Sequence, residues 1–155
     1  MNIKIISLGK TKQSFIKQGV AEYQKRIGRF GKLSWQTLPD VKLSVSNNID
    51  QVKAQEAEII LKKLNPRDYL IALDENGRQF TSPQLSHKLS KLTLQGKTPC
   101  FIIGGVYGLD KQIIEKVDLV MSFSMLTFTH QMIRLLLAEQ IYRAFTIKNN
   151  KKYHY

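Results

Sequence analysis

The stretch "TPCFIIGGVYGLDKQ", residues 98–112, decides which fold class the sequence predicts. An apolar run from Cys100 to Ile103 stops at Gly104-Gly105, and Gly108 follows three positions later. The chain has nine glycines in 155 residues, so three within five positions mark a special turn. In α/β proteins, ligands commonly bind where a strand ends in such a turn. The stretch therefore predicts a buried strand followed by a candidate ligand site.

The glycine turn lacks the signatures of the common phosphate-binding loops. A dinucleotide fingerprint needs G-x-G-x-x-G at the start of a helix, whereas here the order is G-G-x-x-G, late in the chain. The sequence contains neither the complete Walker pattern G-x-x-x-x-G-K-[ST] nor G-x-S-x-G, which excludes a Walker loop and a nucleophile elbow. Glycines at a strand end also allow a ligand or a second chain segment to lie on the backbone. The alternative is a tight turn without a ligand.

A second segment with the character of a ligand site is "SFSMLTFTH", residues 122–130. It is uncharged and combines small hydroxyl side chains with methionine, leucine and phenylalanine. Backbone amides, hydroxyls and apolar walls suit a neutral, flat heterocycle such as adenine better than a triphosphate. The two segments together favour a site for such a ligand.

Outward from these segments, the hydrophobic period alternates between that of strands and that of helices. Strands are expected at residues 3–9, 33–38, 69–74, 100–103 and 118–123. Helices are expected at residues 12–30, 49–64, 82–94, 110–116 and 127–147. Asn76-Gly77 is expected to form a turn, and Ser82 and Thr129 are expected to cap helices. This order predicts one α/β domain over residues 1–155, a mostly parallel sheet flanked by helices, with a short tail at 148–155.

The charge of the chain indicates an anionic partner. Twenty-four Lys and Arg against twelve Asp and Glu give a net charge of +12. Nucleic acid is the most common partner of such a protein, although a basic protein can simply be soluble. The single cysteine, Cys100, cannot form an internal disulfide and suits a reducing compartment, so a cytoplasmic location is expected. No metal-ligand spacing, secretory signal or membrane-spanning segment is expected.

The two ends of the last predicted helix point to macromolecular partners. Between Met132 and Phe145 the helix is apolar on more than one face, which predicts that a second copy of the chain covers it; a fully internal helix is the alternative. The tail "KNNKKYHY" carries lysines for phosphates and aromatic rings for unpaired bases. A solvated, frayed tail is the alternative.

Five segments, in order and across essentially the whole chain, resemble a known family. They are "IKIISLGK", "YLIALDENGRQFTSPQLS", "FIIGGVYGL", "SFSMLTFTHQMIRLLLAEQIYRAFTI" and the terminal "YHY". The family is the SPOUT-class RNA methyltransferases, in particular the small bacterial enzymes that methylate a pseudouridine of 23S ribosomal RNA. The chain departs from the family pattern at Thr129, where proline is usual, and at Tyr155, where a basic residue is usual.

The resemblance implies a C-terminal trefoil knot, a homodimer, no metal, and S-adenosylmethionine (SAM) as methyl donor. It implies methylation of N3 of a pseudouridine in 23S rRNA, within the assembled ribosome. By position, it assigns the cofactor to Leu73, Gly104, Gly105, Phe123, Ser124, Met125, Leu126, Thr127 and Phe128. Two other functions stay open, a non-enzymatic ribosome- or RNA-binding protein of α/β fold and a flavodoxin-like nucleotide or flavin protein.

The resemblance also indicates residues for catalysis and RNA binding. The candidate general base is His154, with His130 second, and Arg143 is a further catalytic candidate. The expected RNA contacts are His130, Arg134, Lys151, Lys152 and Tyr153. Structural roles are the alternatives: His154 stacking or binding phosphate, His130 capping the last helix, and the arginines pairing with Glu139 or a carbonyl.

Overall fold

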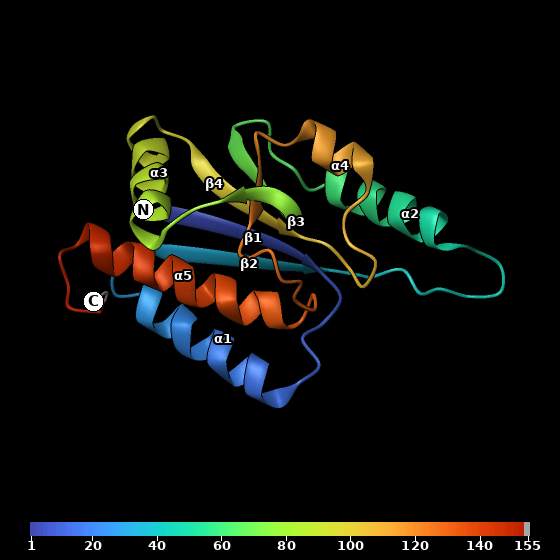
Figure 1. The fold of residues 1–155 in the computed structure, drawn as a ribbon, viewed down its shortest axis with the longest axis horizontal. Helices are drawn as coiled ribbons and strands as arrows, with labels where there is room; N and C mark the ends of the chain where they lie inside the picture. The colour runs from blue at the N-terminus through green and yellow to red at the C-terminus, as the bar shows by residue number, and fades with distance from the viewer. Residues whose placement is uncertain (154–155) are drawn as a thin grey trace.

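Five parallel strands form the central sheet of the protein. A computed structural model describes residues 1–153 and gives the strand order β2-β1-β4-β3-β5 (Figure 1). The strands are β1 (Asn2–Leu8), β2 (Lys32–Leu38), β3 (Asp68–Gln79), β4 (Thr98–Ile103) and β5 (Leu119–Ser122). Every neighbouring pair is parallel. The predicted α/β class with a largely parallel sheet is therefore confirmed.

Helices cover both faces of this sheet (Figure 1). They are α1 (Ser14–Ile27), α2 (Ile49–Leu61), α3 (Ser82–Leu94), α4 (Lys111–Lys116) and α5 (Met132–Lys148). One apolar core joins the sheet to α1, α3 and α5, and a second joins it to α2 and α4. The result is a three-layer sandwich in which α5 packs between α1 and α3.

The apolar run in β4 serves both cores. Phe101 and Ile103 belong to the core under α1, α3 and α5, while Cys100 and Ile102 belong to the opposite core. A strand buried on both faces has no polar side to show, which explains the continuous apolar sequence. Burial raises the pKa of the Cys100 thiol to about 12, so this cysteine is an inert core residue.

The turn predicted at Asn76-Gly77 is wrong, because β3 continues to Gln79. Both Leu73 and Arg78 of β3 pair with Met121 of β5, so the residues between them bulge out of the ladder. A Cβ atom on Gly77 would lie 2.5–2.8 Å from backbone atoms of Met121. The glycine is needed for this close approach of two strands rather than for a turn.

Two helix starts also differ from the prediction. Thr81, not Ser82, caps α3, in a capping box with Gln84, while the Ser82 hydroxyl donates to Gln140 of α5. Helix α5 begins at Met132, and the Thr129 hydroxyl oxygen accepts a hydrogen bond from the Met132 N–H at 3.1 Å. The predicted bond from Thr129 is present, but the segment before Met132 is not helical.

Arg134 is the largest fully buried side chain among the residues that the structure describes. Its guanidinium donates to the carbonyl oxygens of Leu8, Gly9 and His130 and to the Thr11 hydroxyl. The expectation that Arg134 contacts RNA is therefore wrong, because no part of the side chain reaches the surface. The alternative of pairing with carbonyls is correct: the arginine ties the end of β1 to the first turn of α5.

We predict that Arg134→Lys lowers the free energy of unfolding by about 3 kcal/mol, because one ammonium group cannot satisfy all four oxygens and leaves buried carbonyls unpaired. Urea denaturation measures the change. Arg26→Lys is the control, since Arg26 pairs with Glu22 on the exposed side of α1 and should matter far less. Equal effects of the two substitutions would contradict the role of Arg134.

Candidate functional site

A cavity of about 780 Å³ opens at the ends of β4 and β5, beside the bulge of β3, and its volume is within the range of small-molecule sites. Three segments supply most of its wall: residues 73–75, 103–109 and 121–131. In a parallel sheet the carboxyl ends of neighbouring strands meet at one edge, so loops that are far apart in sequence converge there. The position is the usual one for a ligand in an α/β fold.

Most residues assigned to the cofactor by resemblance line this cavity. Eight of the nine do so: Leu73, Gly104, Gly105, Phe123, Ser124, Leu126, Thr127 and Phe128. Met125 does not line it, and its side chain is 90% exposed. The glycine turn and the uncharged loop thus share one cavity, while their roles in binding stay predictions.

The glycine turn folds back on itself. A Cβ atom on Gly104 would lie 2.8–3.0 Å from backbone atoms of Gly108 and Leu109. The Gly108 N–H donates to the Gly105 carbonyl at 3.3 Å, and Gly108 has φ of +79°, which favours glycine. Close backbone contact and a left-handed conformation together explain the cluster of glycines.

Glu56 of α2 lies directly behind the turn. Its side chain is buried, and a Cβ atom on Gly105 would lie 2.7–2.8 Å from the two carboxylate oxygens. One oxygen accepts from the Val41 N–H at 3.1 Å, while the other has no hydrogen-bond partner among the described residues. Burial raises the pKa of this carboxyl group, and the nearby Asp40 acts in the same direction. Sequence reasoning missed Glu56, whose one signal is an acidic residue on the apolar side of α2.

The loop after β5 uses its serines to hold its own backbone. The Ser122 hydroxyl donates to the Ser124 carbonyl at 2.7 Å, and the Ser124 hydroxyl accepts from the Leu126 N–H at 2.9 Å. Leu126 and Phe128 are left 75% and 44% exposed at the cavity. Exposed apolar side chains beside a glycine backbone form the surface on which a flat, neutral ring can pack.

His130 and Gln131 complete the wall at the start of α5. Burial lowers the pKa of His130, and the positive charges of Arg134 and Lys12 lower it further. The Gln131 side chain bonds to the backbone of Lys10 and Lys12, in the loop after β1. Sequence reasoning identified His130 but missed Gln131, because its partners are more than a hundred residues away.

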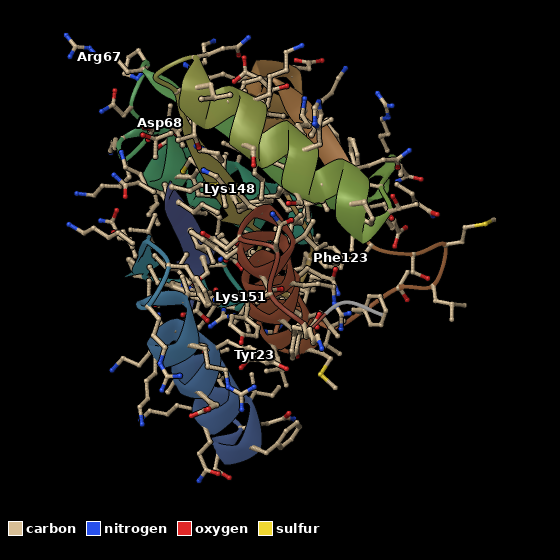
Figure 2. The ribbon with its side chains drawn as sticks, turned by 90° about the vertical axis from the view of Figure 1, so that its left-hand side faces the viewer. Tyr23, Arg67, Asp68, Phe123, Lys148 and Lys151 are labelled. Carbon is tan, nitrogen blue, oxygen red and sulfur yellow. The ribbon has the colours of Figure 1, made fainter. Side chains whose placement is uncertain are left out.

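The remaining predicted residues lie at the other end of α5. Arg143 pairs with Glu139 at 2.6 Å and lies over the ring of Tyr153. Lys151 and Lys152 are exposed, and Figure 2 shows Lys151 beside the end of α5 with Tyr23 of α1 nearby. Helix α5 rises about 22 Å from Ile133, which lines the cavity, to Lys148, and about 15 Å from Ile133 to Arg143. His154 lies outside the described residues.

Residues 1–153 contain no cluster of three or more His, Cys, Asp or Glu side chains that could hold a metal ion. Across the same residues, none of the helices has the length and apolar character needed to cross a membrane.

Comparison with known proteins identifies the family. Residues 1–154 match the sequence family described as "Predicted SPOUT methyltransferase". The chain is therefore a member of the SPOUT methyltransferase family.

Particular relatives are similar along the whole chain. A protein of Leuconostoc citreum (strain KM20), named "Ribosomal RNA large subunit methyltransferase H", is 46% identical, with 99% of each chain covered. The protein of the same name from Streptococcus suis (strain 05ZYH33) is 45% identical at the same coverage. A solved structure of a probable methylase family protein from Haemophilus influenzae Rd KW20 has a TM-score of 0.56 at 17% identity, covering 99% of this chain and 70% of that one. That structural likeness supports the fold.

We predict that Glu56→Gln raises the melting temperature at pH 7.5 more than at pH 4.5. The raised pKa means that folding favours the neutral acid, so stability is lost as the pH rises through the unfolded and then the folded pKa. Glutamine stays neutral and avoids that loss. Thermal denaturation at the two pH values measures the difference, with Glu58→Gln, on the exposed side of α2, as control. A benefit that is the same at both pH values would contradict the prediction.

Proposed function

We propose that the protein is a SAM-dependent methyltransferase that methylates N3 of a pseudouridine in 23S rRNA. The observation that carries the proposal is the shared cavity of the glycine turn and the 122–130 loop, in a chain of the SPOUT methyltransferase family. The names of the relatives support ribosomal RNA of the large subunit as the substrate. The resemblance of the chain to the family implies that the target is a pseudouridine and that the methylated atom is N3.

The residues of the cavity fit the methyl donor. Exposed Leu126 and Phe128 offer an apolar surface for an adenine ring, and the backbone of Gly104 and Gly105 forms another part of the same wall. Leu73 lies in the neighbouring strand β3, just before its bulge. When bound, SAM supplies an activated methyl group, since its sulfonium takes the electron pair of the S–C bond as the N3–C bond forms.

The protein has two tasks in this reaction. It holds N3 in line with the methyl carbon, which is a proximity effect, and it favours loss of the N3 proton, which passes to solvent or to a base. Imides are weak acids, so positive potential and hydrogen-bond donors near the ring assist ionisation. His154 remains a candidate base.

RNA binding is supported by the charge and by the tail. The net charge of +12 is suited to a polyanion. Lys148 and Lys151 lie at the end of α5 (Figure 2), and both they and Lys152 are exposed. Tyr153 packs against Tyr142 with ring centroids 4.7 Å apart, so the start of the tail is anchored on α5. A non-enzymatic RNA-binding protein explains the charge but leaves the cavity without a purpose.

A homodimer is supported by two features of α5. Met132, Ile133 and Leu136 form a partly exposed apolar stripe near its start. The tail begins after Lys148, at the end of α5 that lies away from the cavity, so residues of the tail reach a cavity most simply when a partner copy supplies it. The C-terminal trefoil knot and the assembled ribosome as substrate belong to the same proposal.

We predict that the protein binds SAM and that Leu126→Ala weakens this binding about tenfold, because an apolar contact with the adenine ring is lost. Isothermal titration calorimetry measures both affinities. Met125→Ala is the matched control, an exposed neighbour that does not line the cavity. Absence of heat with the unaltered protein would overturn the proposed cofactor.

The test of the substrate is mass spectrometry of 23S rRNA from cells lacking the gene. One methyl group on a pseudouridine should be missing and should return when the gene is restored. Unchanged rRNA modification would overturn the proposed activity, even if SAM binds.

We also predict that two inactive variants restore activity when mixed. One carries Gly104→Val, which distorts the glycine turn in the cavity wall because its side chain would meet the backbone of Gly108 and Leu109. The other ends at Asn150, which removes Lys151 and the residues after it. Random dimers give one intact site in half the molecules, so about a quarter of wild-type activity should return in a methyl-transfer assay. No recovery after subunit exchange would mean that the tail does not act across the dimer.

A further inference from the structure

Two backbone contacts fix the orientation of the Gln131 side-chain amide. Its Oε1 accepts from the Lys12 N–H at 2.9 Å, and its Nε2 donates to the Lys10 carbonyl at 3.2 Å. A backbone N–H can only donate and a backbone carbonyl can only accept, so the two ends of the amide cannot be exchanged. The two backbone partners therefore determine which end of the Gln131 amide is the nitrogen.

The same nitrogen fixes the protonation of His130. Gln131 Nε2 lies 3.0 Å from His130 Nε2. An amide nitrogen only donates, so His130 Nε2 must accept and carries no proton. A neutral imidazole then has its proton on Nδ1. Protonation of Nε2 would place two donors face to face.

The charges around the ring act in the same direction. Burial lowers the pKa of His130 most, Arg134 of α5 and Lys12 of the loop after β1 lower it further, and Asp40 of the loop after β2 acts in the opposite direction. The ring lines the cavity, and within residues 1–153 no group accepts a hydrogen bond from its Nδ1. A single donor at Nδ1 is left for a ligand.

We infer, on the basis of the proposed function, that His130 is a neutral hydrogen-bond donor to a carbonyl oxygen of the target base and not the general base. Gln131 is the positioning residue that sets its tautomer. Loss of the N3 proton to solvent spreads negative charge onto the two carbonyl oxygens that flank N3. A donor at one oxygen, within the positive field of Lys12 and Arg134, stabilises that charge as the methyl group is transferred.

The tautomer is tested by NMR on the full-length, ¹⁵N-labelled protein. Long-range ¹H–¹⁵N spectra distinguish protonated from unprotonated ring nitrogens, and His130→Ala identifies the signals of this ring among the three histidines. At pH 7.5 we expect the proton on Nδ1. Gln131→Glu replaces the donor with a carboxylate oxygen and should move a proton onto Nε2. A proton on Nε2 in the unaltered protein would overturn the inference.

The role of the donor is tested by kinetics with rRNA. His130→Ala should lower kcat/KM for rRNA about ten- to a hundredfold while leaving SAM affinity unchanged, because one hydrogen bond to a charged group is lost. His130→Asn, whose amide N–H lies near the position of Nδ1, should recover most of that loss. His87→Ala on the exposed side of α3 is the control.

Three outcomes would overturn the role. The first is loss of SAM affinity in His130→Ala, and the second is the absence of rescue by asparagine. The third is that His130→Ala removes the acidic limb of the pH–rate profile, because removing a general base has that effect. Failure of the proposed function is recognised separately, since the unaltered protein would then not methylate rRNA while the NMR measurement would still report the tautomer.

Discussion

The burial of the Arg134 guanidinium is the interaction on which the site depends. A charged group without solvent is tolerated only when its donors are satisfied, and here four oxygens from two segments satisfy them. Those oxygens belong to the end of β1 with its loop and to His130, two residues before α5. The arginine thus holds the loop after β1 against the start of α5, where the cavity wall is built.

The consequences of this tie extend to the chemistry of the cavity. With the loop after β1 in place, the backbone of Lys10 and Lys12 orients Gln131, and Gln131 in turn orients His130. The same arginine contributes the positive potential that lowers the pKa of His130. Arg134 therefore holds the two segments together and also adds positive charge beside His130.

Two features beside the cavity are unusual for a protein core, and both lie at the glycine turn. The buried Glu56 has an unpaired oxygen, and Gly104 to Gly108 includes backbone contacts too close for any Cβ atom. Stable cores avoid unpaired polar atoms and glycine-rich segments, so such exceptions concentrate where a protein binds ligands. The end of α5 that carries the tail is different in kind, since exposed lysines and packed aromatic rings meet there.

Much of the fold was predictable because its signals are local. Alternating strand and helix periods, the doubly buried β4 and the glycine turn depend on neighbouring residues, and the structure confirms the parallel α/β sheet. Proximity of the glycine turn to the 122–130 loop also followed, because carboxyl ends of parallel strands share an edge. The extension of β3 was not predicted, because Asn76-Gly77 is typical of a turn and the close contact of Gly77 with Met121 appears only in the structure.

The amino-acid sequence by itself determined the order of strands and helices, the positive charge and the residues that line most of the cavity. Only the tertiary structure decided that Arg134 is buried, that Glu56 lies behind Gly105, that Gln131 orients His130, and that the tail begins far from its own cavity. The physical reason is that burial, hydrogen-bond partners and protonation depend on atoms brought together from distant segments. No local pattern of residue types encodes those distances.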